Sequence, residues 1–304
     1  MFKGILISFA VLSLATASVA MADQALTPAM QQLKDKADKG DANAMTDLGN
    51  AYLALVPEDD KNAMVWFMKS AAGGNLNGIY NVAWMYDNAK GVPADHAKAF
   101  EYYKKAADAG SVQAEYCEGW DLFYGLGVAK DQQQGAKLLE KAANGGNVAA
   151  MYYLAGCYRD GAGEDQDFDQ AMAWFKKASD LNYGDARDSI GRMYQQGQGV
   201  DPDNKKAVNW FRQGAAIGDA LSMVDLAYAY LIGVGVDKDP DKALAWYRKA
   251  ADAGNATGMY NVGACYLNGT GVDADPKQAR DWMTKAAAAG SPDATTWLAA
   301  NPAK

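Results

Sequence analysis

Glycine recurs along this chain at a fixed interval, and this period constrains the fold more than any other feature. Successive members of the series are 36 residues apart. At one place Asn182 stands where glycine is expected, and asparagine is the other residue that readily adopts the left-handed conformation at the end of a helix. The series is Gly74, Gly110, Gly146, Asn182, Gly218, Gly254 and Gly290. Such a period predicts stacked copies of one supersecondary unit.

Within each unit the residue pattern predicts two helices joined by a glycine-rich turn. In the last unit, small and apolar residues between Ala256 and Leu267 follow a helical spacing. A turn spans residues 268–272, and Pro276 lies in the first turn of a second helix, where its missing N–H costs nothing. That helix ends at Gly290. Seven units are predicted, over residues 41–74, 75–110, 111–146, 147–182, 183–218, 219–254 and 255–290.

A single helix pair cannot bury its apolar faces alone, so neighbouring units must stack around one continuous core. The predicted fold class is therefore all-α, a right-handed α/α superhelical solenoid of about seven helix-turn-helix repeats, which are 36 residues long except for the first, which is two residues shorter. Residues 23–40 and 291–304 are expected to form capping helices at the two ends, which a solenoid needs to stay soluble. Small rotations between units would give the array an extended concave face.

Three segments carry the repeat pattern closely enough to resemble a known family. They begin at Gly91, Gly197 and Gly233 and read GVPADHAKAFEYYKKAADAG, GQGVDPDNKKAVNWFRQGAAIG and GVGVDKDPDKALAWYRKAADAGNA. They are similar to the Sel1-like repeat (SLR) family of exported bacterial proteins, whose long G-x-G-V-x-x-D turn distinguishes them from tetratricopeptide units of about 34 residues. The resemblance implies that the first helices line the concave side. It also implies a scaffold or adaptor that binds a partner protein or peptide there, as a periplasmic regulator, an immunity protein or a host-interaction factor.

The first 22 residues have the pattern of a secretory signal peptide. Lys3 precedes an uncharged apolar run over residues 4–19, and Ala20-Met21-Ala22 is a small-x-small cleavage pattern. We expect cleavage before Asp23 and a periplasmic or secreted protein, and the alternative is an uncleaved single-span anchor. Without Lys3, 28 basic residues face 37 acidic ones. This charge, and the lack of a further long apolar segment, predict no nucleic-acid partner and no membrane span after cleavage.

Aromatic residues on the predicted first helices are the main candidates for partner binding. Trp84 and Trp120 occupy one helical position in successive units, two residues after a recurring apolar core position. Exposure of tryptophan at two equivalent places is costly unless a partner covers it, and Trp and Tyr dominate interface energetics. Arg192 and Tyr228 hold the same position in later units. The candidate set is Trp84, Trp120, Tyr80, Tyr116, Phe123, Tyr124, Arg192 and Tyr228.

Packing inside the solenoid is the alternative role for several of these side chains. Tyrosine is common in the resembled family at the position of Tyr80 and Tyr116, which favours packing for these two. Trp84 and Trp120 suit packing and partner binding equally well. Arg192 could contact an acidic partner segment or belong to a solvated face.

No combination of residues predicts a catalytic, metal or cofactor site. His96 is the one histidine of the chain, and three scattered cysteines cannot easily complete a zinc site with it. Cys117, Cys157 and Cys265 are expected to be buried apolar side chains, and a Cys117–Cys157 disulfide is the alternative. The common serine-hydrolase, zinc-hydrolase and nucleotide-loop motifs are absent.

Aspartates recur in the predicted turns, as D-x-D at Asp201 and Asp203 and again around Asp239. No glutamate closes a loop at the EF-hand distance, so helix N-capping is predicted rather than calcium binding. The chain is accordingly predicted not to be an enzyme. Two alternatives stay open: a hydrolase of the β-lactamase-like type described for some members of the resembled family, and a carbohydrate- or cell-wall-binding module that uses Trp84 and Trp120.

Overall fold

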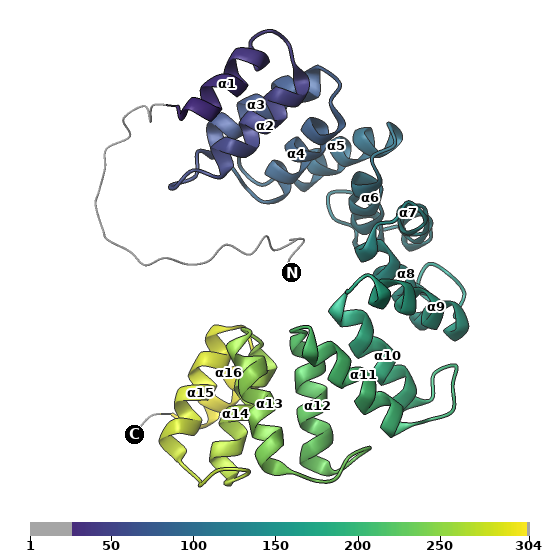
Figure 1. Ribbon diagram of the computed structural model, residues 1–304, viewed down its shortest axis with the longest axis vertical. Coiled ribbons are helices and arrows are strands. Elements are labelled where there is room, and N and C mark those ends of the chain that lie inside the picture. The colour runs from purple at the N-terminus through teal and green to yellow at the C-terminus, as the bar shows by residue number, and fades with distance from the viewer. Residues whose placement is uncertain (1–25, 303–304) are drawn as a thin grey trace.

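The computed structural model describes residues 26–302, and in this part the chain forms sixteen α-helices and no β-strand. The predicted signal peptide, residues 1–22, lies outside the described residues. Figure 1 shows the helices stacked in a curved array whose two ends lie on the same side. The helices are α1 Pro28–Ala37, α2 Ala42–Leu53, α3 Asp60–Ala72, α4 Leu76–Asp87, α5 His96–Asp108, α6 Val112–Tyr124, α7 Gln132–Asn144, α8 Val148–Asp160, α9 Phe168–Asp180, α10 Gly184–Gln196, α11 Asn204–Ala216, α12 Ala220–Ile232, α13 Pro240–Asp252, α14 Ala256–Asn268, α15 Pro276–Ala288 and α16 Pro292–Ala300. None of these helices is long and apolar enough to cross a membrane.

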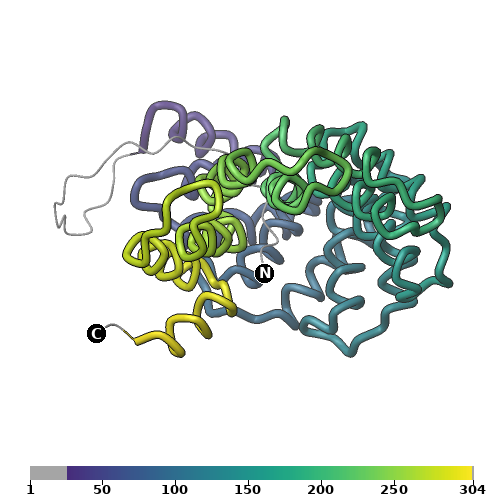
Figure 2. Tube along the Cα trace, turned by 90° about the horizontal axis from the view of Figure 1, so that it is seen from below, coloured from purple at the N-terminus to yellow at the C-terminus, as the bar shows by residue number. Residues whose placement is uncertain are grey.

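The helices form seven pairs, from α2 with α3 to α14 with α15, with α1 and α16 at the two ends. The first helices of the pairs also contact one another directly, at α2–α4, α10–α12 and α12–α14. Figure 1 places α6 and α8 on the inner side of the curve and α7 and α9 on the outer side, and Figure 2 follows the same array from below. The predicted all-α solenoid is confirmed. We call the inner side of the curve, on which α6 and α8 lie, the concave face.

Aspartates cap the second helices and close the turns that precede them. The Asp203 carboxylate accepts a hydrogen bond from the backbone N–H of Lys206 at 2.9 Å. The backbone N–H of Asp203 itself donates to the carbonyl oxygen of Tyr194, at the end of the first helix, at 2.8 Å. Asp239 makes the equivalent bonds one repeat later. The predicted N-capping role of these two residues is confirmed, and each cap also ties the two helices of its pair together.

Within a pair, a small residue of the first helix faces a large buried residue of the second. At Gly191, a Cβ atom would overlap with the ring of Phe211, which is 1% exposed. In the third pair, Gly119 and Gly135 face each other, so the backbones of α6 and α7 approach closely. The small residue admits the partner helix and the large one fills the remaining space, which gives the dense packing of a protein interior.

The second glycine of each turn joins one repeat to the repeat before it. Gly235 has a φ of +75°, which side-chain-bearing residues rarely adopt. A Cβ atom there would also overlap with the carbonyl oxygen of Asn204, the first residue of the preceding second helix, α11. The same approach to a carbonyl oxygen recurs as Gly91 with Asp60, Gly127 with His96, Gly163 with Gln132 and Gly271 with Pro240, whereas the nearest atom at Gly199 is the Cβ of Phe168. This contact sets how closely successive pairs stack.

Substitution of Gly235 by alanine is expected to destabilise the chain more than substitution of Gly254. Both residues have positive φ, which costs alanine roughly 1–2 kcal/mol. Only Gly235 meets backbone atoms, whereas a Cβ at Gly254 has nothing within 4 Å. We expect overlap to add roughly 1–3 kcal/mol for Gly235→Ala. Urea unfolding followed by circular dichroism measures both variants, and equal losses of unfolding free energy would show that the close approach has no role in stacking.

Candidate functional site: an aromatic cleft on the concave face

A cleft of about 290 Å³ opens between the first helices α6 and α8, near their C-terminal ends. Its floor reaches the second helices α7 and α9 through Leu139 and Phe175, which are buried in the core. Aromatic rings from both first helices form most of its wall. The lining residues are Trp120, Phe123, Tyr124, Leu139, Tyr152, Tyr153, Gly156, Cys157, Arg159, Asp160, Ala162 and Phe175.

The rings of the cleft contact one another across the junction of two repeats. The Trp120 ring lies 4.4 Å from the Tyr124 ring and 4.4 Å from that of Tyr153, measured between centroids. Tyr116 stacks on Tyr153 at 6.0 Å, below the rim. Tyr124 is 50% exposed, whereas Trp120 and Tyr153 are half-buried. The wall is thus a connected aromatic surface with one edge open to solvent, a composition typical of protein contact sites.

Gly156 keeps the cleft open. A Cβ atom at this position has nothing within 4 Å, so alanine would fit there without a clash. Glycine inside a helix costs roughly 0.5–1 kcal/mol relative to alanine, and no packing contact at this position offsets that cost. The equivalent positions of other repeats carry side chains that would fill the space, namely Trp84, Trp120, Arg192, Tyr228 and Ala264. Glycine at position 156 therefore lowers helix stability and leaves a void beside Trp120 and Tyr153.

Polar and titratable groups line only part of the cleft. Arg159 makes a bidentate ion pair with Asp160, with N–O distances of 2.7 and 2.8 Å, and its guanidinium lies 5.8 Å from the Phe175 ring centroid. Burial raises the pKa of the Cys157 thiol to about 12, so this thiol is protonated at neutral pH and is not an activated nucleophile. Burial also raises the pKa of Tyr152 and of Tyr153. The cleft can therefore offer aromatic surface, hydroxyl groups and one paired arginine.

The structure brings four of the eight predicted partner-binding residues together, and Trp120, Phe123 and Tyr124 line the cleft itself. Tyr116 is buried beside them, with a ring 6.3 Å from that of Trp120. Trp84 lies apart, packed half-buried on a different core cluster one repeat earlier. Tyr80 packs against the Tyr103 ring at 5.5 Å, also outside the cleft. The predicted patch is thus divided between two junctions.

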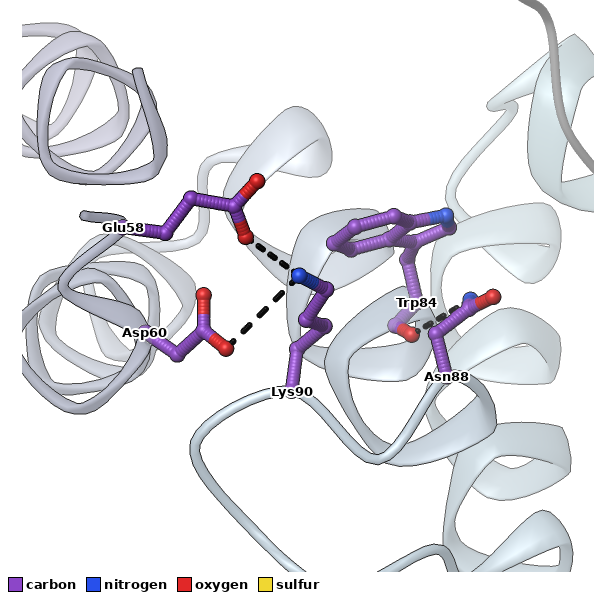
Figure 3. A network of polar contacts seen from close by, with 5 residues as sticks. All are labelled: Glu58, Asp60, Trp84, Asn88 and Lys90. Atoms are coloured by element: carbon purple, nitrogen blue, oxygen red, sulfur yellow. Dashed lines mark hydrogen bonds and ion pairs between the residues drawn. The ribbon is translucent and has the colours of Figure 1, made fainter. Parts of the chain in front are cut away.

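Trp84 lies near a separate group of ion pairs on the N-terminal side, drawn in Figure 3. The Lys90 ammonium binds the Glu58 carboxylate and lies 3.8 Å from a carboxylate oxygen of Asp60. The Asn88 side-chain amide donates to the Trp84 carbonyl oxygen at 2.9 Å. These contacts cap the end of α4 and connect it to the preceding pair.

Arg192 and Tyr228 lie on the first helices α10 and α12, beyond the cleft. The Arg192 guanidinium contacts carboxylate oxygens of Asp188 and Asp225, each at 2.8 Å. Tyr228 is exposed on α12 and projects from the same helical position one repeat later. Neither residue reaches the aromatic cleft, so the structure separates them from Trp120.

Sequence reasoning missed Tyr153 and the role of Gly156. Recognising them requires the register between neighbouring repeats. The residue at the Trp120 position contacts a side chain of the next first helix, and that side chain lies three residues before the position equivalent to Trp120. This register pairs Asn50 with Asn81 at 3.4 Å, Trp120 with Tyr153 and Arg192 with Asp225. Once this offset is known, Tyr153 can be identified from the sequence as the neighbour of Trp120.

The one histidine of the chain lies outside the cleft. The His96 Nδ1 lies 2.7 Å from a carboxylate oxygen of Asp87 on an exposed surface. Cys117, Cys157 and Cys265 are buried as thiols, so the alternative Cys117–Cys157 disulfide is not formed in this structure. In residues 26–302, no group of three or more His, Cys, Asp or Glu side chains is placed to hold a metal ion.

A curved array of helix pairs with an open concave face defines a helical-repeat solenoid. A family model described as Sel1 repeat matches seven segments of the chain, residues 42–75, 77–111, 114–147, 148–183, 185–219, 220–255 and 256–291. The chain therefore belongs to the Sel1 repeat family, as the sequence resemblance predicted. This solenoid fold is typical of protein–protein interaction scaffolds.

Solved structures with the same fold support this membership. The protective antigen c5321 of uropathogenic Escherichia coli, which displays an SLR fold, is 32% identical with a TM-score of 0.64, covering 89% of this chain and 66% of that one. This chain thus spans just under two thirds of that protein. A Sel1 repeat protein from Oxalobacter formigenes is also 32% identical, with a TM-score of 0.70 over 90% of this chain and 80% of that one. A search of curated proteins gives no match.

Gly156→Ala is expected to stabilise the chain by roughly 0.5–1 kcal/mol, because alanine favours the helix and meets no neighbour. Gly191 lies in the next first helix, one residue before the position equivalent to Gly156. Gly191→Ala is expected to destabilise the chain by roughly 1–3 kcal/mol, because the added methyl group would overlap with Phe211. Chemical unfolding of the two variants beside the parent chain tests the pair. Loss of stability in Gly156→Ala would mean that the cleft is filled in the folded protein.

Proposed function

We propose that the chain is an exported scaffold or adaptor that binds a partner protein or peptide on the concave face of the solenoid, with the α6–α8 aromatic cleft as an anchor point. The cleft carries this proposal. Trp120, Tyr124 and Tyr153 form an apolar surface with an open edge, and Gly156 leaves room beside it for a side chain of the partner.

A macromolecular partner fits this surface better than a small enclosed substrate. The cleft lies between two neighbouring first helices, so a bound segment can extend from it along the array. Tryptophan, tyrosine and arginine are the residue types that contribute most to binding at the centre of protein interfaces. Tyr124, Trp120 and Arg159 supply all three around one cavity.

The chemistry of the cleft supports binding rather than catalysis. A nucleophile needs a lowered pKa or an adjacent base, whereas burial raises the pKa of Cys157. The Arg159 guanidinium is already paired with Asp160. We therefore propose a non-enzymatic role, as a periplasmic regulator, an immunity protein or a host-interaction factor.

A photo-reactive residue at the cleft rim tests partner binding directly. Placed at position 124, it is expected to crosslink one protein in cells, whereas the same residue at position 213 on the convex helix α11 is not. The captured protein is then identified, purified and titrated against the parent chain. Gly156→Trp, which fills the void, should weaken binding by at least about tenfold, the loss expected when an interface anchor is excluded.

Trp282→Ala is the matched control, because it removes a half-buried tryptophan from the second helix α15 and should leave the affinity unchanged. Equal binding by the parent chain and Gly156→Trp would place the binding site elsewhere. Displacement of the captured protein by cell-wall oligosaccharides would favour the carbohydrate-binding alternative instead.

Export is tested at the N-terminus of the mature protein. Expressed in full in a bacterium with a periplasm, the chain is expected to begin at Asp23 and to appear in the periplasmic or medium fraction, since a signal peptidase reads small residues at Ala20 and Ala22. Ala22→Arg should block this cleavage and leave a longer, membrane-associated chain. A parent protein that keeps Met1 and stays in the cytoplasm would contradict export.

A further inference from the structure

Four aspartates meet at the junction of the first helices α10 and α12, which we call the acidic seam: Asp185, Asp188, Asp219 and Asp225. One arginine, Arg192, lies against them. Its guanidinium contacts Asp188 and Asp225 at 2.8 Å each. Asp185 lies beside Asp219, which also caps α12 by accepting from the Ser222 N–H at 2.8 Å. The negative charge of the seam therefore exceeds the positive charge supplied by the chain.

Two other junctions carry uncharged residues where the acidic seam carries carboxylates. At the equivalent positions of two other junctions, neutral amides pair instead: Asn75 donates to Asn43 at 2.6 Å, and Asn147 donates to Gln113 at 2.9 Å. In the seam, Asp219 and Asp185 occupy these same positions. Gly184 lets Asp219 come close, because a Cβ at Gly184 would lie 2.7 Å from the Asp219 Cβ. Two carboxylates thus stand where the other junctions have a hydrogen-bonded amide pair.

Asp188 is the buried centre of the acidic seam. It is 3% exposed, one carboxylate oxygen binds Arg192, and the other, Oδ1, is buried without a hydrogen-bond partner. Burial and the neighbouring Asp225 raise the pKa of Asp188 to about 8. Burial and Asp219 raise that of Asp185 to about 6. A buried carboxylate that lacks a full complement of partners favours either a proton or a second cation.

The following charged and titratable groups face the Asp188 carboxylate. Asp219 and Asp225 come from α12, Arg192 from α10 itself and the Tyr152 hydroxyl from α8. Arg192 is the one cation among them. Any second cation at the seam would therefore come from outside this group of residues.

Exposed apolar side chains border the acidic seam on the concave face. Leu221, Tyr228 and Ile232 follow one stripe of α12, seven and four residues apart, and are 38%, 49% and 43% exposed. This spacing keeps them on the same face of the helix. One repeat in the opposite direction lies the aromatic cleft with its open position at Gly156. An extended segment along the curve would meet aromatic, acidic and aliphatic surfaces in turn.

We propose that the acidic seam binds a lysine or arginine side chain of an extended partner segment whose neighbouring apolar residues lie on the Leu221–Tyr228–Ile232 stripe. This inference rests on the proposed protein-binding function of the concave face and names the chemistry of the partner. Charge complementarity carries it, since four aspartates share one arginine and the buried Asp188 keeps an oxygen without a hydrogen bond.

The pH dependence of binding follows from the same arrangement. In the free protein a proton partly neutralises the acidic seam, because the raised pKa values of Asp185 and Asp188 keep both carboxyls partly protonated near neutral pH. A cationic side chain favours the charged carboxylates and lowers their pKa, so binding releases a proton. Affinity should therefore rise with pH between about 6 and about 8, the two pKa values of the free groups.

The folding stability of the free protein should fall as pH rises, whereas the binding affinity should increase. A raised carboxyl pKa means that the folded chain binds more protons than the unfolded chain, so this contribution is fully present below the unfolded pKa and is lost as pH rises through the folded value. Asp188→Asn removes the titration and should flatten the fall in unfolding free energy up to pH 8. An unchanged slope would show that Asp188 does not hold the proton.

Selection from a library of random peptides displayed on phage tests the partner chemistry. The parent chain should enrich peptides with a lysine or arginine next to aromatic or aliphatic residues. Asp188→Asn/Asp225→Asn, which keeps the side-chain shapes, should lose the basic residue from its selected peptides. The matched control is Asp180→Asn/Asp252→Asn, which removes the same charge from exposed positions on the second helices α9 and α13 and should select as the parent does.

The outcomes separate the two proposals. Two results would overturn the acidic seam as a cation site and leave the concave-face function intact. In the first, the selected peptides bind the cleft and lack a basic residue. In the second, the parent chain and the seam variant select the same peptides. Failure of every variant to enrich any peptide would contradict both. The circular dichroism spectrum and thermal midpoint of the seam variant, which should match or exceed those of the parent, exclude misfolding as the cause.

A selected peptide then serves as the probe for calorimetry. Its affinity should rise by at least about threefold from pH 6 to pH 8, and its binding heat should depend on the ionisation enthalpy of the buffer, which reports proton release. Replacing its basic residue by norleucine should lower the affinity by about tenfold and remove the pH dependence. A norleucine peptide with the same affinity and pH profile would overturn the proposal.

Discussion

The stacking of the solenoid depends on the close approach of one backbone to another at each junction. The second glycine of a turn, such as Gly235, meets the carbonyl of the first residue of the preceding second helix, here Asn204. A side chain would fit neither the positive φ nor the space. Because this contact recurs from Gly91 to Gly271, every pair is placed on the previous one in nearly the same way, and small rotations accumulate into the curve of Figure 1.

Regular stacking gives the concave face a fixed register between neighbouring first helices. A residue of one first helix contacts a residue of the next first helix that lies three positions before its own equivalent. This register brings together the amides of Asn50 and Asn81, the rings of Trp120 and Tyr153, and the charges of Arg192 and Asp225. The scaffold is thus uniform, whereas the chemistry at each junction depends on which residues occupy the facing positions. A repeat protein can in this way carry different recognition surfaces along one array.

Two junctions depart from what stability alone would favour. At the aromatic cleft, Gly156 leaves a void where alanine would fit. At the acidic seam, carboxylates are packed together where other junctions pair amides, and Asp188 is buried among them. Both departures lie at junctions between neighbouring first helices. Features that cost folding stability, confined to such junctions, are what a binding surface in an otherwise consistent repeat array would show.

The sequence by itself determined the all-α class, the helix pairs, the aspartate caps and the family, because these depend on local periodicity and on glycines that the backbone conformation requires. It also selected Trp120, Phe123 and Tyr124, since aromatic residues on first helices can be recognised from the repeat. Only the tertiary structure separated Trp84 from Trp120, joined Tyr153 to the cleft and showed the aspartates around Arg192 to be one cluster. These outcomes depend on the offset between neighbouring helices, which is set by how glycine turns and small residues let backbones approach, and a single repeat does not contain that information.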